Sequence, residues 1–324
     1  MEVRLKPVRT LIAATVIATF AGAVAAQDAK QLVIGTGGTG GVYYPLGGGL
    51  ANIIGKEIPN TQATAQVTGA SVDNLKLIAA GKADIGFTQV DAAWDAIKGQ
   101  GKFMAPLPVK ALTVLYPNHL HAVTVDGTGI AKVEDLKGKR VSVGSAGSAT
   151  EVFSVRVLEA AGLDADKDIV KEKLGASESV NAMKDRKIDA FFWVGGLPTA
   201  AITDLAATPN TTINFLNVDQ YGDKMNAKYG PLYSPAVIPK ATYKGMTEDA
   251  KNLTVWNILA VNENMPEDLA YKLTKLIFDK RDDLGLVHGE GKNIKLESQS
   301  VKRSGIPFHK GSLKYFAEKG IKVE

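Results

Sequence analysis

Short apolar runs alternate with longer segments of helical periodicity along this chain, and the series occurs twice. The first series predicts strands at residues 32–34, 63–67 and 84–87 and helices at residues 43–55, 71–80 and 91–98. The second predicts strands at residues 140–143, 169–174 and 188–192 and helices at residues 150–161 and 177–186. A β-α-β-α-β series forms a parallel sheet with helices on both faces. The pattern therefore predicts an α/β protein made of two similar units.

The first strand of each unit runs into a glycine-rich loop that opens a helix. These loops are residues 35–41 and residues 144–150. Ligands of open α/β sheets bind outside the carboxyl ends of the strands, and a helix N-terminus favours a negatively charged group there. We therefore expect the two loops to line facing walls of one ligand cleft.

The order of the elements also predicts how the chain divides. Extended segments near residues 119–125 and 236–239 are expected to connect the two units, and the helical segments at 268–278 and 312–319 are assigned to the first. The prediction is a two-lobed protein in which each lobe is an open mixed sheet flanked by helices. Lobe I comprises residues 27–118 and 240–324, and lobe II comprises residues 119–239, including the hinge strands.

Residues 1–26 have the composition of a signal peptide. Arg4, Lys6 and Arg9 give a basic start, residues 11–24 are uncharged and mostly apolar, and small residues follow. The alternative is a membrane anchor, but the run is shorter than the roughly 20 residues that span a bilayer, and no stop-transfer pattern follows. We expect export with cleavage after Ala25 or Ala26.

Composition narrows the possible chemistry. The chain has no cysteine, which excludes disulfides and thiolate metal sites. Its formal net charge of +4 falls to about +2 without the signal peptide, which carries three basic residues and one acid. Charges of both signs are interspersed, without the polybasic blocks of nucleic-acid-binding proteins. We therefore expect a monomer that binds no nucleic acid.

Candidate ligand-binding residues lie at the predicted carboxyl ends of the strands. They offer backbone amides, hydroxyls, one amide side chain and aromatic walls. One tyrosine of the adjacent pair is expected to face the core, and the serine and threonine that begin the second helix could instead cap it. The candidates are Thr39, Gly40, Gly41, Tyr43, Tyr44, Ser71, Gln89, Ser145, Gly147, Ser148, Thr150, Trp193, Gly195 and Gly196.

No arginine is predicted at these loops. Arg140 precedes its strand and is expected at the opposite end of the sheet, and the direction of Arg156 stays open. An anion would then be held by amides, hydroxyls and helix dipoles.

Several long motifs resemble one family. They are residues 34–45, 135–144, 189–196 and 305–311 and the pair Thr274-Lys275. Together they are similar to the TAXI family of TRAP-transporter solute receptors, except that Phe308-His309-Lys310-Gly311 replaces the usual Leu-His-Pro-Gly. The resemblance implies a periplasmic-binding-protein fold of type II-like form. It also implies a periplasmic receptor that delivers a small, usually anionic solute to TRAP membrane permease subunits. A glutamate- or 2-oxoglutarate-like carboxylate or an amino acid fits the predicted donors, whereas an aromatic or sulfonated compound could fit Tyr43, Tyr44 and Trp193.

The main alternative is an NAD-dependent oxidoreductase. Residues 35–40 satisfy the dinucleotide fingerprint, but Thr68-Gly69-Ala70 stand where an acid should bind the ribose. Nucleophile-elbow and zinc-helix motifs are absent from the sequence, and the His119-x-His121 pair is interpreted as structural. We therefore expect no enzyme activity, no cofactor and no metal.

Overall fold

The computed structural model describes residues 1–2 and 29–324. The predicted signal peptide, residues 1–26, lies outside the described residues except for Met1 and Glu2. Within the described ranges, no helix is long and apolar enough to cross a membrane.

All ten strands of the described chain belong to one sheet, whose main order is β2-β1-β3-β10-β4-β7-β5-β6. Strand β8 pairs with β4, and β9 pairs with β10. The strands are β1 (Lys30–Gly35), β2 (Thr61–Gln66), β3 (Ile85–Gln89), β4 (Val109–Val125), β5 (Arg140–Ser142), β6 (Val170–Glu172), β7 (Ala190–Gly195), β8 (Ile213–Phe215), β9 (Ser234–Ile238) and β10 (Ala250–Asn262).

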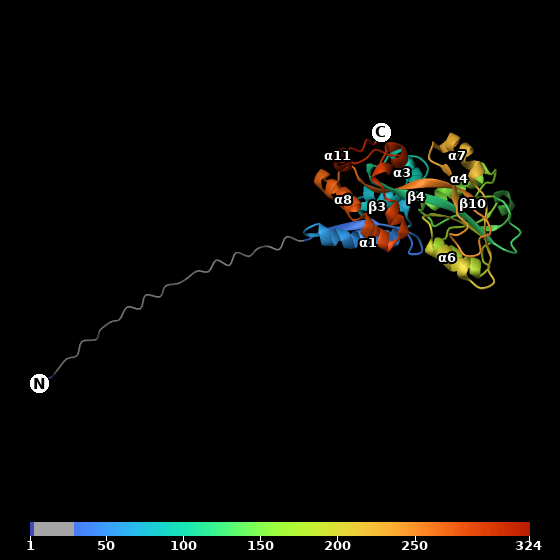
Figure 1. The fold of residues 1–324 in the computed structure, drawn as a ribbon, viewed down its shortest axis with the longest axis horizontal. Helices are drawn as coiled ribbons and strands as arrows, with labels where there is room; N and C mark the ends of the chain where they lie inside the picture. Colours follow the sequence, from blue (N-terminus) through green and yellow to red (C-terminus); the bar gives the residue numbers. More distant parts are fainter. Residues whose placement is uncertain (3–28) are drawn as a thin grey trace.

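Helices cover both halves of this sheet. In Figure 1, α1, α3, α8 and α11 lie around one half and α4, α6 and α7 around the other. The α-helices are α1 (Tyr43–Glu57), α2 (Ser71–Ala79), α3 (Val90–Lys98), α4 (Ala149–Ala160), α5 (Ala176–Lys184), α6 (Ala200–Ala207), α7 (Gly222–Tyr229), α8 (Glu267–Asp279), α9 (Arg281–Val287), α10 (Val301–Ser304) and α11 (Lys310–Glu318). The 3-10 helices are η1 (Val133–Leu136), η2 (Asp219–Tyr221), η3 (Gly289–Asn293) and η4 (Leu296–Ser298).

The two predicted β-α-β-α-β series form, and their pairings match. Strand β1 lies between β2 and β3 and is parallel to both, just as β5 lies between β6 and β7. Each series then meets a long antiparallel strand, since β3 pairs with β10 and β7 pairs with β4. Strands β4 and β10 pair with each other and run from one half to the other (Figure 1).

One predicted connecting strand is misplaced. The segment near residues 119–125 is the end of β4, as the pattern suggested. The segment at residues 236–239, however, belongs largely to β9, which pairs with β10, and β10 is the second strand that joins the halves. Strand β10 is buried along most of its length, so its sequence lacks the apolar–polar alternation that marks a half-buried strand. The lobe boundaries drawn from these strands stay a prediction.

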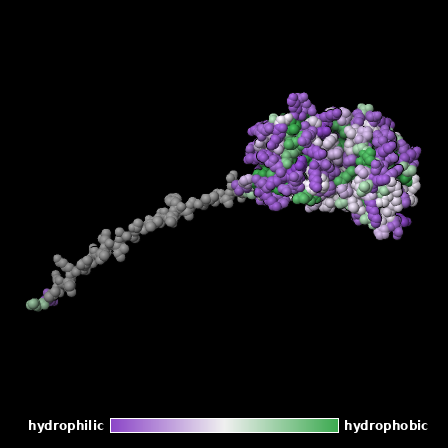
Figure 2. Space-filling model, in the orientation of Figure 1, coloured by the Kyte–Doolittle hydropathy of each residue, from purple (hydrophilic) through white to green (hydrophobic). Residues whose placement is uncertain are grey.

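The core follows the predicted apolar positions. In α1, the periodic residues Leu46, Leu50, Ile53 and Ile54 are all buried, and each contributes about 1.5–3 kcal/mol relative to exposure. They pack with residues of β1, α8 and α9 in one cluster, and another cluster gathers residues of α5, α6 and β8. The face shown in Figure 2 is mostly hydrophilic, with separate hydrophobic areas.

A buried polar cluster also links the two halves. Arg156 of α4 forms an ion pair with Asp95 of α3, and the side chains are 7% and 2% exposed. Arg156 also donates to the Tyr233 hydroxyl over 2.8 Å, and this hydroxyl donates to Asp91 over 3.1 Å. Burial raises the pKa of Asp91 to about 6, although the charge of Arg156 acts in the opposite direction.

We predict that Asp91→Asn becomes more stable relative to wild type as the pH rises from 4 to 7. A carboxyl whose pKa is higher in the folded protein stabilises the fold below its unfolded pKa, and this stabilisation is lost as the pH rises through about 6. The difference in unfolding free energy should change by about 3 kcal/mol over this range. Urea unfolding of both proteins at each pH measures it. A difference that is constant with pH would contradict the assignment.

Candidate functional site

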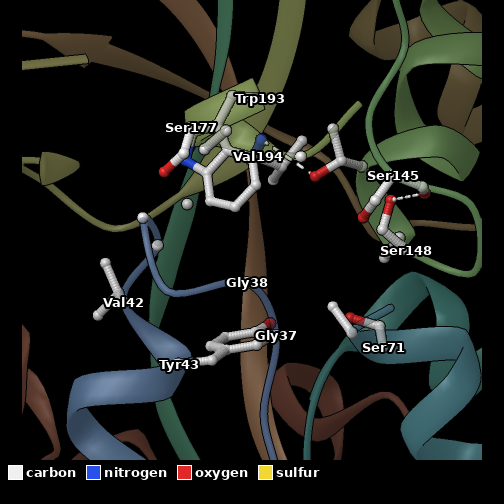
Figure 3. Close-up of a pocket in the computed structure, with 18 of the residues that line it drawn as sticks. Gly37, Gly38, Val42, Tyr43, Ser71, Ser145, Ser148, Ser177, Trp193 and Val194 are labelled. Carbon is white, nitrogen blue, oxygen red and sulfur yellow. Dashed lines mark hydrogen bonds between the residues drawn. The ribbon is translucent and has the colours of Figure 1, made fainter. Parts of the chain in front are cut away.

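A cavity of about 320 Å³ lies between the two halves of the molecule, at the carboxyl ends of the parallel strands. Figure 3 shows Tyr43 and Ser71 on one side and Ser145, Ser148 and Trp193 on the other. Most of the predicted residues line it: Thr39, Gly40, Gly41, Tyr43, Ser71, Gln89, Ser145, Ser148, Thr150, Trp193 and Gly195. Tyr44, Gly147 and Gly196 do not line it.

The first glycine loop and the start of α1 form one wall. The Tyr43 ring stacks on Phe87 with centroids 5.1 Å apart, and its hydroxyl donates to the side chain of Asn257. Burial raises the pKa of Tyr43, so the phenol stays neutral. Tyr44 is 37% exposed, because consecutive helix residues face different directions. Of the tyrosine pair, Tyr43 thus lines the cavity and Tyr44 does not.

Two buried amide side chains form the inner end of the cavity. Gln89 is the last residue of β3, whereas the pattern ended that strand two residues earlier, at Phe87. Its backbone amide donates to the Ser71 hydroxyl over 3.1 Å. Ser71 is the first residue of α2, and its side chain does not cap that helix. Gln89 Oε1 and Asn118 Oδ1 have no hydrogen-bond partner in the described part of the chain. Both residues line the cavity, and both oxygens are buried.

The second glycine loop forms the facing wall. Ser148 caps α4, since its hydroxyl accepts from the Glu151 amide over 3.1 Å and donates to the Ser145 carbonyl over 2.7 Å. Thr150 accepts from the Val194 amide over 3.3 Å. The capping alternative left open by the sequence thus holds for Ser148.

Gly147 forms a contact between the second glycine loop and helix α2. Its carbonyl accepts from the Val72 and Asp73 amides at the start of α2, over 3.0 and 3.1 Å. Its φ is +79°, and a Cβ there would lie 2.3 Å from Asp73 Oδ1. Gly147 therefore packs against the start of α2 and does not line the cavity, so its predicted contact with a ligand stays a prediction.

Trp193 lies within β7, although the pattern ended that strand at residue 192. Its indole N–H donates to the Thr199 hydroxyl over 3.0 Å, and its ring packs against Gly41, where a Cβ would come within 2.9 Å of it. Gly195 lines the cavity, but Gly196 faces Glu290, which a Cβ would approach to 2.7 Å. The indole is thus held in place as part of the wall, whereas Gly196 does not line the cavity and its predicted contact with a ligand stays a prediction.

The residues at the start of α5 were not predicted to line the cavity. Residues Lys173–Glu178 line the cavity beside the second glycine loop. A signal was present, because Gly175-Ala176-Ser177 repeats Gly69-Ala70-Ser71, which leads into α2 in the first half. Asn118 was also missed, because it lies within β4 and not at a strand end.

Four helices begin at the cavity. The first residues of α1, α2, α4 and α5 all line it, so the positive ends of four helix dipoles meet there. Lys173 and Glu178 are the charged residues among the described lining residues. Arg140 pairs with Asp189 over 2.6 Å. As predicted, Arg140 does not line the cavity. Arg156 belongs to the buried polar cluster described above.

Hydrogen bonds join the two walls around the cavity. Besides the Gly147 contacts, the Ala201 amide donates to the Gly40 carbonyl over 3.4 Å. The Leu197 amide donates to Glu290 over 2.8 Å. Each glycine loop thus accepts hydrogen bonds from the beginning of a helix in the opposite half.

We predict that Ser148→Ala lowers the unfolding free energy by about 1 kcal/mol, the usual cost of a lost N-cap. The matched control is Ser145→Ala, because Ser145 also lines the cavity but makes only a long contact of 3.5 Å to the Gly69 carbonyl. Thermal and urea unfolding measure both variants. Equal stability of the two variants would contradict the capping role.

The chain is similar to known proteins in sequence and in fold. The model of the NMT1-like family matches residues 34–320. The fold is similar to that of a phosphonate transporter binding protein from Pseudomonas aeruginosa, with 13% identity, 81% of this chain and 79% of that chain covered, and a TM-score of 0.52.

Two further solved structures are similar in the same way. For the aliphatic sulphonate binding protein of Escherichia coli, the identity is 16%, the coverage 89% of this chain and 83% of that chain, and the TM-score 0.48. For a cysteine-binding protein from Campylobacter jejuni, the identity is 14%, the coverage 81% of this chain and 88% of that chain, and the TM-score 0.49. The fold is thus that of periplasmic binding proteins, and at these identities the likeness carries the fold alone.

Proposed function

Since the chain belongs to the NMT1-like family and holds a cavity between the halves of its sheet, we propose that it is a periplasmic solute-binding receptor. The observation that carries the proposal is the meeting of four helix starts from both halves at one cavity. Such a site binds a small anion with backbone amides and helix dipoles, without a catalytic group. The protein then captures the solute by closure of lobe I (27–118 and 240–324) on lobe II (119–239).

The proposed solute is a small organic anion, such as a glutamate- or 2-oxoglutarate-like carboxylate or an amino acid. Its carboxylate would bind the amides at the helix starts, and its hydrogen-bond donors would meet Gln89 and Asn118. The cavity volume of about 320 Å³ suits a compact molecule held between the rings of Tyr43 and Trp193.

The proposed partner is a membrane permease of the TRAP type. The resemblance of residues 34–45, 135–144 and 305–311 to the TAXI family supports this choice. Uptake by permease-containing vesicles that requires this protein and a sodium gradient is the expected result. Uptake that requires ATP instead would contradict the TRAP type while leaving the receptor function intact.

We predict that Gln89→Ala weakens binding of the captured acid by about tenfold, the effect of losing one hydrogen bond of about 1.4 kcal/mol. A thermal-shift screen of dicarboxylic acids and amino acids with the ligand-free protein identifies the acid, and calorimetry measures its affinity. Tyr44→Ala is the control, because Tyr44 is adjacent to the wall but does not line the cavity. Unchanged affinity in Gln89→Ala, or no binding in the whole screen, would contradict the proposed site.

The nicotinamide alternative predicts a different result. Gly69, which stands where the ribose-binding acid should be, packs closely enough on the second loop that a Cβ would lie 2.6 Å from the Ala146 carbonyl. This contact leaves little room for a ribose at that point. We therefore expect no change in NADH fluorescence on titration with the protein, and saturable binding would restore the oxidoreductase alternative.

A further inference from the structure

Lys173 is the one lysine or arginine among the described residues that line the cavity. It follows β6 and precedes α5, on the wall formed by the second half. Its ammonium group lies 2.9 Å from Glu151 Oε1, and its side chain is 43% exposed. A lysine at the rim therefore lies within reach of both the cavity and a carboxylate of the protein.

Glu151 holds two lysines on the same oxygen. Lys102, from the segment after α3, approaches Oε1 to 3.0 Å, and the Glu151 side chain is only 4% exposed. Although burial raises the pKa of Glu151, the two lysines lower it below its ordinary value. The carboxylate is therefore ionised at neutral pH and is paired twice.

From this geometry we infer that Lys173 is a specificity residue that binds the second anionic group of a dianionic solute. The inference rests on the proposed function. Since Lys102 also pairs with Glu151, Lys173 can turn from Glu151 to a solute carboxylate without leaving a buried carboxylate unpaired, which would be strongly destabilising. The helix starts bind one carboxylate, and Lys173 binds the other.

Glu178 is the other charged residue among the described lining residues. It lies in the first turn of α5, close to Gly175, where the helix dipole favours its negative charge. Lys102 does not line the cavity, although it binds the same oxygen as Lys173. The two lysines therefore form a matched pair for a test, equal in their contact with Glu151 and different in their access to the solute.

The test compares L-glutamate with L-glutamine, which differ only in the second charged group. In calorimetry, the wild-type protein should bind glutamate more tightly than glutamine. Lys173→Met should weaken glutamate binding by about tenfold, as expected for one partly exposed charge-assisted bond, and leave glutamine binding nearly unchanged. Lys173→Arg should keep the preference, and so should Lys102→Met. Thermal unfolding verifies that each variant is folded.

Four results would overturn the inference. They are a Lys173→Met variant that keeps the wild-type preference, a Lys102→Met variant that loses it equally, a wild-type protein that does not prefer glutamate, and a wild-type protein that binds neither compound. The receptor function is judged separately, by the wider screen of organic acids.

Discussion

The antiparallel pairing of β4 with β10 is the constraint on which the rest of the structure depends. The ladder runs from His119 opposite Thr254 to Val109 opposite Asn262, and it is buried along most of its length. A shift by one residue would turn every side chain to the other face, so the register is strongly specified. Because β3 pairs with β10 and β7 pairs with β4, this ladder makes the carboxyl ends of both parallel series face one cavity.

An irregularity in the same ladder affects side chains that line the cavity. The register shifts between Trp256 and Ile258, and Asn257 between them does not pair with β4. Its side chain donates to the Tyr116 carbonyl over 3.2 Å and accepts from Asn118 over 2.8 Å and from the Tyr43 hydroxyl. β-Bulges redirect side chains in this way next to binding sites. One break in the pairing thus orients two residues that line the cavity.

The local pattern predicted both β-α-β-α-β series and most of the cavity, since strand ends and helix starts are encoded by short-range periodicity and glycine. It missed what depends on tertiary structure. Strand β10 is buried without alternation, Trp193 continues a strand, and Gly147 is required by a contact with α2. Lys173 could not be found from periodicity, because its role follows from the reach of a long side chain toward Glu151.

The hydrogen bonds around the cavity separate two kinds of polar group. The Val72 and Asp73 amides at the start of α2 donate to the Gly147 carbonyl, and the Glu151 amide of α4 donates to the Ser148 hydroxyl. Backbone groups held in this way are oriented without the loss of side-chain entropy that a long side chain would incur. Gln89 Oε1 and Asn118 Oδ1 are buried without a partner in the described part of the chain, and each costs about 1–3 kcal/mol in that state. The Gly147 contacts that join the halves therefore use satisfied backbone groups, whereas the unsatisfied polar atoms belong to side chains of residues that line the cavity.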